Sequence, residues 1–366
     1  MSLLFMDGFD SYPNEITTNI WSSPYSKWSN GFESLRGKIY GAQNGRFNDS
    51  KSLLINSGSY SDGAAYIYKN LNINANTLIV GMAFKTDWTL DSGRSVRIFG
   101  LADVTSVQMG VNLTYENKIF ITRGGAINSF GTTIASTNVP LLINTWNYIE
   151  FKVTFDSING SYQLKLNGKN LLLNNGPVAT VTTSNNYANR LLLSGVSSYG
   201  GLVDYSAPNF FFDDLYVCDD QGSTNNSFLG ECRIQTSLPS ADHSVDFTPS
   251  SGSNFEAVNE LVANTSDYVT SNTPGDIDLY DVDDLNVIPD TVYAIQTNVV
   301  AKKDNVATRT IKPVILSNVT TVEGSEYSLL TEYTSTSMIL EQDPDVNDSW
   351  TEESINALKI GFKIEQ

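Results

Sequence analysis

Apolar residues at every second position constrain the fold of this chain more than any other feature of its sequence. Leu78, Val80, Met82 and Phe84 follow this spacing, and residues 107–113 repeat it with Val, Met, Val and Leu. Side chains two residues apart lie on the same face of a β-strand, so each stretch predicts a half-buried strand. Such stretches recur roughly every ten residues with turn-forming residues between them, and no helical crossovers are visible. We therefore expect an all-β fold.

Asparagine-glycine pairs mark two hairpins in the first half of the chain. The pairs at 159–160 and 167–168 flank the alternating stretch 162–166, and Asn-Gly tolerates the positive φ angles that tight turns need. Residues 209–217 are apolar on both faces apart from Asp213 and Asp214. This pattern predicts a central strand that closes a first sandwich.

Charge is divided unevenly along the 366 residues. The formal net charge is -18, and residues 219–366, with 7 Lys or Arg against 25 Asp or Glu, account for all of it. A chain longer than about 100 to 200 residues favours two domains. We predict a neutral first domain at 1–218, an acidic connector region at 219–290 and a C-terminal β domain at 291–366, of which the connector could form part.

The acidic balance and the amino terminus exclude several partners and compartments. A surface without a basic stripe repels phosphate backbones and anionic lipid, so we expect no nucleic-acid binding and no membrane insertion. The amino terminus has no basic residue before Asp7 and only a short apolar run, which predicts no secretion signal. Cys218 and Cys232 lack redox or zinc spacing. We expect unpaired structural thiols, with a disulfide at the domain junction as the alternative.

The sequence lacks the residues that catalysis by histidine or zinc requires. His243 is the single histidine, and it lies in the polar 219–290 stretch without a nucleophile motif around it. One histidine and two dispersed cysteines cannot complete a zinc shell without carboxylates. The alternating acids that a glycoside hydrolase would display fall in the connector rather than in an apolar strand. We therefore predict that the chain is not an enzyme.

Carboxylates leave calcium as an open alternative. Asp213 and Asp214, or the acids at 276–284, could supply oxygen ligands, although neither group matches a calcium-loop motif. The interpretation we prefer is that Asp213 and Asp214 accept hydrogen bonds from backbone or turn donors. The later acids would then form a charged, solubilising face. On this interpretation the chain needs no cofactor.

Aromatic residues are the remaining candidates for ligand contact. The chain has 18 tyrosines, and a flat ring can stack on the face of a sugar while its hydroxyl makes a hydrogen bond. Surfaces of β-sandwiches are generally rich in tyrosine, so the count alone does not specify a site. The tyrosines that we select for ligand contact are Tyr66, Tyr68, Tyr199 and Tyr205.

Four stretches in the first part of the chain carry a family resemblance. They are 5–12 (FMDGFDSY), 146–153 (WNYIEFKV), 164–168 (LKLNG) and 212–217 (FDDLYV). Together they resemble the concanavalin A-like, or laminin G-like, jelly-roll domains over residues 1–218. Three later stretches look like the continuation found in virion proteins of tailed phages; they are 228–234, 239–242 and 267–269.

This resemblance implies both a fold and a function. It implies a jelly-roll sandwich followed by a second, smaller β-sandwich-like domain, in a phage virion structural protein such as a fibre, tail-associated or capsid-attached appendage. Such a protein acts by assembly and host-surface recognition, with other virion proteins and further copies of itself, a trimer by analogy, as partners. Its implied location is the virion, assembled in the host cytoplasm.

Two alternatives have different functions on the same fold. One is a carbohydrate-binding module for host-surface glycans. The other is a polysaccharide depolymerase, but hydrolytic relatives carry a Glu-x-Asp-x-x-Glu strand that this chain lacks. Fold alone does not decide between them.

Overall fold

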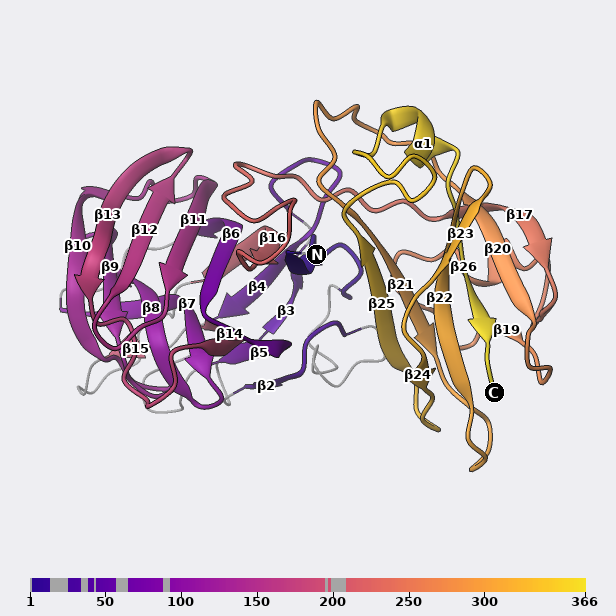
Figure 1. Cartoon of the computed structure of the whole chain (residues 1–366), viewed down its shortest axis with the longest axis horizontal. Coiled ribbons are helices and arrows are strands. Elements are labelled where there is room, and N and C mark those ends of the chain that lie inside the picture. The colour runs from indigo at the N-terminus through magenta and orange to yellow at the C-terminus, as the bar shows by residue number, and fades with distance from the viewer. Residues whose placement is uncertain are drawn as a thin grey trace. The chain divides into compact units, whose positions relative to one another are not determined.

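The chain forms two compact units. The computed structural model describes residues 2–13, 26–33, 39–42, 44–56, 65–87, 93–194, 197–198 and 209–366. The first unit comprises Met1–Ser22 and Trp28–Ile234, and the second comprises Ser23–Lys27 and Gln235–Gln366 (Figure 1). Nearly all regular structure in both units is β-strand, which confirms the predicted all-β class.

The first unit is a sandwich of two antiparallel sheets of eight strands each. In spatial order, the first sheet contains β13 (Lys169–Val178), β12 (Gly160–Leu166), β11 (Asn147–Thr154), β6 (Thr77–Thr86), β16 (Asn209–Cys218), β4 (Ser52–Asn56) and β3 (Ile39–Ala42), with β1 (Leu3–Asp7) paired to β16. The second sheet contains β10 (Thr132–Pro140), β9 (Lys118–Arg123), β8 (Ser106–Thr114), β7 (Ser95–Asp103), β14 (Ala188–Ser194), β5 (Tyr66–Ala75) and β2 (Asn30–Phe32), with β15 (Ser197–Ser198) paired to β7.

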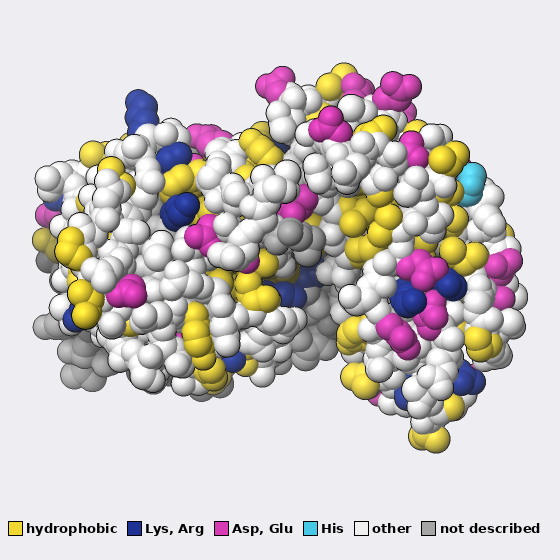
Figure 2. Space-filling model, viewed as in Figure 1, with side chains coloured by type: hydrophobic (Ala, Val, Ile, Leu, Met, Phe, Trp, Pro, Cys, Tyr) yellow, Lys and Arg dark blue, Asp and Glu magenta, His cyan; other side chains and the backbone are white. Residues whose placement is uncertain are grey.

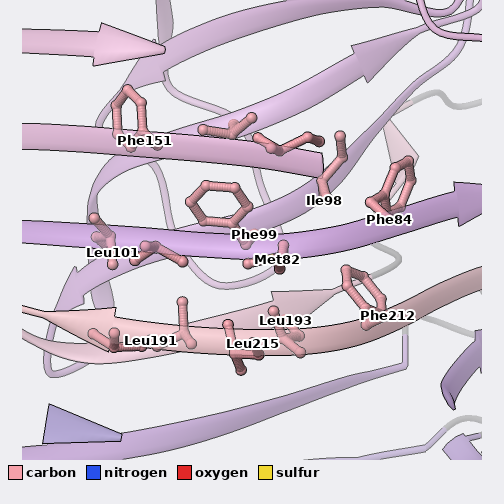
Figure 3. Close-up of a cluster of buried hydrophobic side chains, with 14 of the residues drawn as sticks. Met82, Phe84, Ile98, Phe99, Leu101, Phe151, Leu191, Leu193, Phe212 and Leu215 are labelled. Atoms are coloured by element: carbon pink, nitrogen blue, oxygen red, sulfur yellow. The ribbon is translucent and has the colours of Figure 1, made fainter. Parts of the chain in front are cut away.

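The core of the first unit lies between these two sheets. Alternate side chains of each strand point inward, and the rings of Phe84, Phe99, Phe151 and Phe212 are fully buried there (Figure 3). The period-two pattern is confirmed in β12, whose residues alternate between buried and half-buried. The sequence predicts half-buried strands at β6 and β8, but both are buried at nearly every residue, because their outer faces are covered as well. Burying one large apolar side chain stabilises the fold by about 1.5 to 3 kcal/mol, so this double layer supplies most of the stability.

Strand β16 is central, as predicted, and its outer face is also covered. Residues 228–234, here called the strap, lie against that face. The Tyr216 hydroxyl donates to Oε1 of buried Glu150 (2.7 Å) and accepts from the backbone N–H of Leu229 (3.1 Å). The N–H of Gly230 donates to the same Glu150 oxygen (2.9 Å). The strap therefore covers these polar groups and at the same time supplies hydrogen bonds in place of the water that it displaces.

Asp214 and Arg46 bind the C-terminal end of the strap. The N–H of Ile234 donates to Oδ1 of buried Asp214 (2.8 Å), and the guanidinium of Arg46 donates to the carbonyl of Cys232 (3.0 Å). Residues 219–234 thus belong to the first unit, whose boundary lies 16 positions beyond the predicted 218. Neither Cys218 in β16 nor Cys232 in the strap takes part in a disulfide, which agrees with structural thiols rather than with a disulfide at the domain junction.

The second unit is built from three smaller antiparallel sheets. Its largest sheet contains β17 (Pro239–Val245), β20 (Ile277–Val282), β26 (Lys359–Ile364), β22 (Thr310–Ser317) and β23 (Thr320–Glu323), with β24 (Tyr327–Ser328) paired to β22. The two-stranded sheets are β18 (Thr248–Pro249) with β19 (Val269–Thr270), and β21 (Ile295–Ala301) with β25 (Thr334–Leu340). The helices described are η3 (Phe255–Ala257) and α1 (Glu352–Asn356). The core of this unit includes Ile315, Trp350 and Leu358.

Most of the region predicted as an acidic connector, 219–290, is folded as part of the second unit, which is the alternative that we gave for it. This region contains β17, β18, β19 and β20, and β20 lies inside the largest sheet between β17 and β26. Its acids are used structurally: Asp278 is fully buried and accepts from the N–H groups of Asp246 (2.7 Å) and Phe247 (3.0 Å). The acids at 276–284 are predicted to form a solubilising face, whereas Asp278 among them is an internal acceptor for backbone N–H groups.

Candidate functional site

Two of the four tyrosines selected from the sequence lie on one outer face of the first unit. Tyr66 and Tyr68 are half-buried on β5, and between them Ile67 points into the core. Because neighbouring side chains of a strand point to opposite faces, both tyrosines lie on the outer face of the second sheet. Tyr199 and Tyr205 lie outside the described residues.

The structure places two further residues beside these tyrosines. Phe32 of β2 stacks on Tyr66, with ring centroids 5.7 Å apart and planes 23° apart, and its side chain remains 44% exposed. The guanidinium carbon of Arg190, from β14, lies 3.9 Å from the centroid of the Tyr68 ring. Its Nε donates to Oδ1 of Asn70 (2.9 Å). We call Phe32, Tyr66, Tyr68 and Arg190 the aromatic strip.

The chemistry of the strip is that of a binding surface. Burial raises the pKa of Tyr66, the nearby Tyr68 adds to this rise, and Arg190 opposes it. The Tyr66 hydroxyl therefore stays protonated at neutral pH and can donate a hydrogen bond. Stacked rings, a hydroxyl donor and a guanidinium on one sheet face suit a ligand with flat apolar faces and polar edges.

An apolar patch continues the outer face next to the strip. Ala102, Val107 and Leu192 are fully buried there, with Tyr66 and Tyr68 packed against them. These three residues come from β7, β8 and β14, so the strip is anchored on neighbouring strands of a rigid sheet. Sites on strands hold their side chains more firmly than sites on long loops.

A buried arginine lies on the same face, beneath residues 124–131. The guanidinium of Arg97 donates to the backbone carbonyls of Ala126 (3.1 Å), Ile127 (2.9 Å) and Ser129 (2.6 Å), and the Phe130 ring lies 5.4 Å away. Burial lowers its pKa to about 10, so it is still charged at neutral pH. Arg97 therefore holds the loop against the sheet rather than contacting solvent.

Replacing Arg97 with Ala should release this loop. Three carbonyls would lose charged donors, and we expect the free energy of unfolding to fall by about 2 kcal/mol, since relief of the buried charge offsets part of the loss. Urea denaturation followed by tryptophan fluorescence measures the change. Arg190→Ala, which removes a half-exposed guanidinium from the same face, is the matched control and should change stability far less. Equal effects of the two substitutions would contradict this role.

The acid pair Asp213–Asp214 accepts hydrogen bonds, as predicted. Asp213 Oδ2 accepts from the N–H of Arg46 (2.7 Å) and the hydroxyl of Ser50 (3.2 Å), and Asp213 Oδ1 accepts from the N–H of Asp214 (2.8 Å). Burial raises the pKa of Asp213 to about 8, with the charge of Asp214 as the second cause. Burial likewise raises the pKa of Asp214 to about 6, against the pull of the Ile234 N–H and Arg46.

Other candidates from the sequence do not converge on a site. Within the part of the chain that the structure describes, no three His, Cys, Asp or Glu side chains are grouped so as to hold a metal ion. His243 is exposed on β17 (Figure 2). Among the acids at 276–284, Asp278 is buried as a hydrogen-bond acceptor in the second unit. No helix among the described residues is long and apolar enough to cross a membrane.

Comparison with known proteins gives similarity to solved structures only. No model of a known protein family matches the chain, and no curated protein matches it. Alginate lyase Aly36B is similar with a TM-score of 0.39 and 12% identity over 59% of this chain and 96% of that one. The catalytic domain of a GH131 β-glucanase from Podospora anserina has a TM-score of 0.40 and 13% identity, over 62% of this chain and 99% of that one.

A third similar structure is a carbohydrate-recognition domain, that of Emp46p, with a TM-score of 0.35 and 9% identity over 58% of this chain and 98% of that one. The solved structures named here are therefore carbohydrate-binding or polysaccharide-acting proteins. The resemblance to phage virion proteins gains no support from these comparisons.

One prediction is corrected by the comparisons. We predicted from missing motifs that the chain is not an enzyme, but an alginate lyase and a β-glucanase are among the similar structures, and this finding overturns that prediction. The prediction relied on the absence of histidine-based and hydrolase motifs. Polysaccharide cleavage can use other residue types held by a sheet, so absent motifs were too narrow a criterion.

Proposed function

We propose that the first unit binds a polysaccharide through the aromatic strip. The observation that carries the proposal is the stacked pair of Phe32 and Tyr66, with Arg190 packed on Tyr68 beside it. Aromatic rings present apolar faces that match the C–H faces of a pyranose, while the hydroxyl and guanidinium donate to sugar oxygens. The similar solved structures that act on or recognise carbohydrates agree with this proposal, which itself rests on the contacts of the aromatic strip.

Exposure of Phe32 supports a ligand at this position. Strand β2 has three residues, and Phe32 places an apolar ring at its end with 44% of the side chain exposed. Its ring stacks on that of half-buried Tyr66, which supports it from the sheet. An exposed aromatic ring that stacks on a second ring next to polar donors is typical of a recognition surface.

Removing the stacked pair should abolish binding. We expect Phe32→Ala with Tyr66→Ala to weaken retention of the cognate polysaccharide at least tenfold, as measured by affinity electrophoresis over a panel of bacterial and plant polysaccharides. Tyr115→Ala removes a comparably exposed ring (38%) from the β8–β9 turn and is the matched control. Retention of an uncharged polysaccharide that survives in the double variant, or that falls equally in the control, would contradict the proposal.

The same samples test whether the bound polymer is also cleaved. Release of reducing ends, or of unsaturated products that absorb ultraviolet light, would add chemistry to binding. Tyr66→Phe then separates the two activities, because it keeps the ring and removes the hydroxyl. Binding with cleavage lost would assign the Tyr66 hydroxyl to proton transfer.

Attachment to a phage particle is a second proposal, and it rests on the sequence resemblance. A glycan-binding sandwich displayed on a virion would serve host adhesion, in line with the alternative functions above. Mass spectrometry of purified particles tests it directly. Absence of the protein from particles would contradict a virion location while leaving polysaccharide binding intact.

A further inference from the structure

A lysine between two aromatic rings lies on the other outer face of the first unit. The Lys85 ammonium is 4.7 Å from the ring centroid of Trp146 and 4.5 Å from that of Phe211. Lys85 pairs with Phe211 across β6 and β16, and Phe84 and Phe212, the adjacent residues, point into the core. Lys85 and Phe211 therefore lie on the outer face of the first sheet. We call Trp146, Lys85 and Phe211 the lysine row.

The described residues do not neutralise the charge of the Lys85 ammonium in the lysine row. Among the described residues, no carboxylate lies within ion-pair distance of Lys85. Asp87 acts on it electrostatically, but the Asp87 oxygens accept from the N–H (3.1 Å) and the side-chain amide (2.7 Å) of Asn209. Burial lowers the pKa of Lys85, which shows that its ammonium has lost part of its hydration. A partly desolvated cation gains more from a new anionic partner than a fully hydrated one.

The hydrogen bonds of the strap do not reach the lysine row. Its contacts reach Glu150 and Tyr216, and Arg46 stacks on Tyr148 at 5.0 Å. Trp146 comes two positions before Tyr148, so the row lies beyond the part of the sheet that the strap contacts. All three of its residues are half-buried, so part of each side chain remains exposed among the described residues.

Lysine on an aromatic ring is common in proteins, about once per 70 to 80 residues for the cation–π class as a whole. This chain offers a direct comparison in Lys165, which lies 4.2 Å from the ring of Phe228. That ring belongs to the strap, so the Lys165 contact joins two parts of the fold. Lys85 instead has a ring on each side, one from β16 and one from the residue before β11, and the strap contributes neither ring.

We propose that the lysine row binds a carboxylate-bearing sugar unit of an acidic polysaccharide. The two rings receive apolar sugar faces, and the ammonium pairs with the carboxylate. This site lies on the opposite sheet from the aromatic strip, so it goes beyond the function proposed above. Two binding faces on one sandwich raise the avidity for a repetitive polymer without new contacts at either face.

Lys85→Met is the variant that tests the charge, because it keeps the length of the apolar stem between the rings. The probes are polygalacturonate and the same polymer with its carboxyl groups reduced to alcohols, applied to the full chain in affinity electrophoresis at low and high salt. For the unaltered protein we expect at least tenfold stronger retention of polygalacturonate, and a preference that weakens with salt. Lys85→Met should remove this preference. Lys165→Met, the matched control, should keep it.

A second variant tests the aromatic part of the lysine row, and thermal unfolding checks that each variant is folded. Trp146→Leu should weaken retention of both polymers, and an unchanged thermal unfolding midpoint confirms that each variant is folded. Equal retention of the two polymers by the unaltered protein, or a preference that survives in Lys85→Met, overturns the proposal. The Phe32→Ala, Tyr66→Ala double variant distinguishes the sites, since the carboxylate preference should persist there even when the strip no longer binds.

Discussion

A fragment that ends at Cys218 is expected not to fold, whereas one that ends at Ile234 should fold by itself. The strap contributes backbone donors to Tyr216, Glu150 and Asp214. A neutral hydrogen bond is worth about 1 kcal/mol, and one to a charged group about 1.5 to 3 kcal/mol. With one bond to the Tyr216 hydroxyl and two to carboxylates, we expect a loss of about 4 to 7 kcal/mol without the strap, which is comparable with the whole stability of a typical domain.

The two fragments, 1–218 and 1–234, are compared by circular dichroism and thermal unfolding. The longer fragment should show a cooperative transition at the midpoint of the first unit in the full chain. The shorter one should show none, or one at a much lower temperature. A cooperative transition of equal midpoint in both fragments would place the domain boundary at 218, as the sequence had suggested.

The first unit is expected to be more stable in mild acid than in mild base. Asp213 and Asp214 have pKa values raised to about 8 and about 6, above the ordinary aspartate value of 3.8. A carboxyl whose folded pKa is raised contributes stability that is complete below its unfolded pKa and is lost as pH rises through its folded pKa. With about 1.4 kcal/mol per pKa unit, we expect the free energy of unfolding to fall by several kcal/mol between about pH 4 and about pH 8.

Chemical denaturation of fragment 1–234 at a series of pH values, in the presence of a chelator, measures this fall. Asp213→Asn should flatten the profile, because the amide cannot ionise beside Asp214. Asp49→Asn, which removes an exposed partner of Arg233, should leave the profile unchanged. A profile of the unaltered fragment that is flat or rises with pH would contradict the role of the pair.

Calcium provides a useful contrast in the same experiment. The sequence left a calcium site at Asp213 and Asp214 as an alternative. A bound cation would lower both pKa values and remove the loss of stability at high pH. Repeating the series with calcium therefore separates a pair that relies on backbone donors from a pair that holds an ion.

The sequence predicted the first sandwich well, because many of its strands carry apolar residues at alternate positions. The hairpin at Asn167-Gly168 also formed as expected, with both residues at positive φ (50° and 73°). Gly160 has a different role: it begins β12, where an added Cβ would lie 2.2 Å from the Thr180 hydroxyl oxygen. Sequence patterns describe local conformation, whereas the requirement for glycine at position 160 comes from Thr180, 20 positions away in the sequence.

The candidate sites likewise contain some residues that a local pattern identifies and others that only long-range strand pairing brings together. Tyr66 and Tyr68 could be selected because they alternate with apolar residues along a single strand. Phe32 and Arg190 could not, since they reach the strip only through the pairing of β2 and β14 with β5. The lysine row was missed for the same reason, because cross-strand register joins Lys85 to Phe211 over more than a hundred residues.

The strap was missed because its anchors resemble surface residues. Glu150 and Tyr216 are polar, and in a strand with alternating character they suggest a solvated face. The structure buries both, with Glu150 1% exposed, because residues 228–234 return to the sheet. A polar sequence can cover a sheet when its backbone supplies the hydrogen bonds, and hydrophobic patterning does not detect such a cover.

Gly81 gives this arrangement a recognisable evolutionary signature. An added Cβ at position 81 would lie 2.1 Å from Cε1 of Tyr216, so the ring can lie flat across β6 only above a glycine. Any side chain there would lift the tyrosine and with it the hydroxyl that joins Glu150 to the strap. In distant homologues too divergent to align by overall identity, glycine, glutamate and tyrosine at these three positions would mark inheritance of the covered sheet.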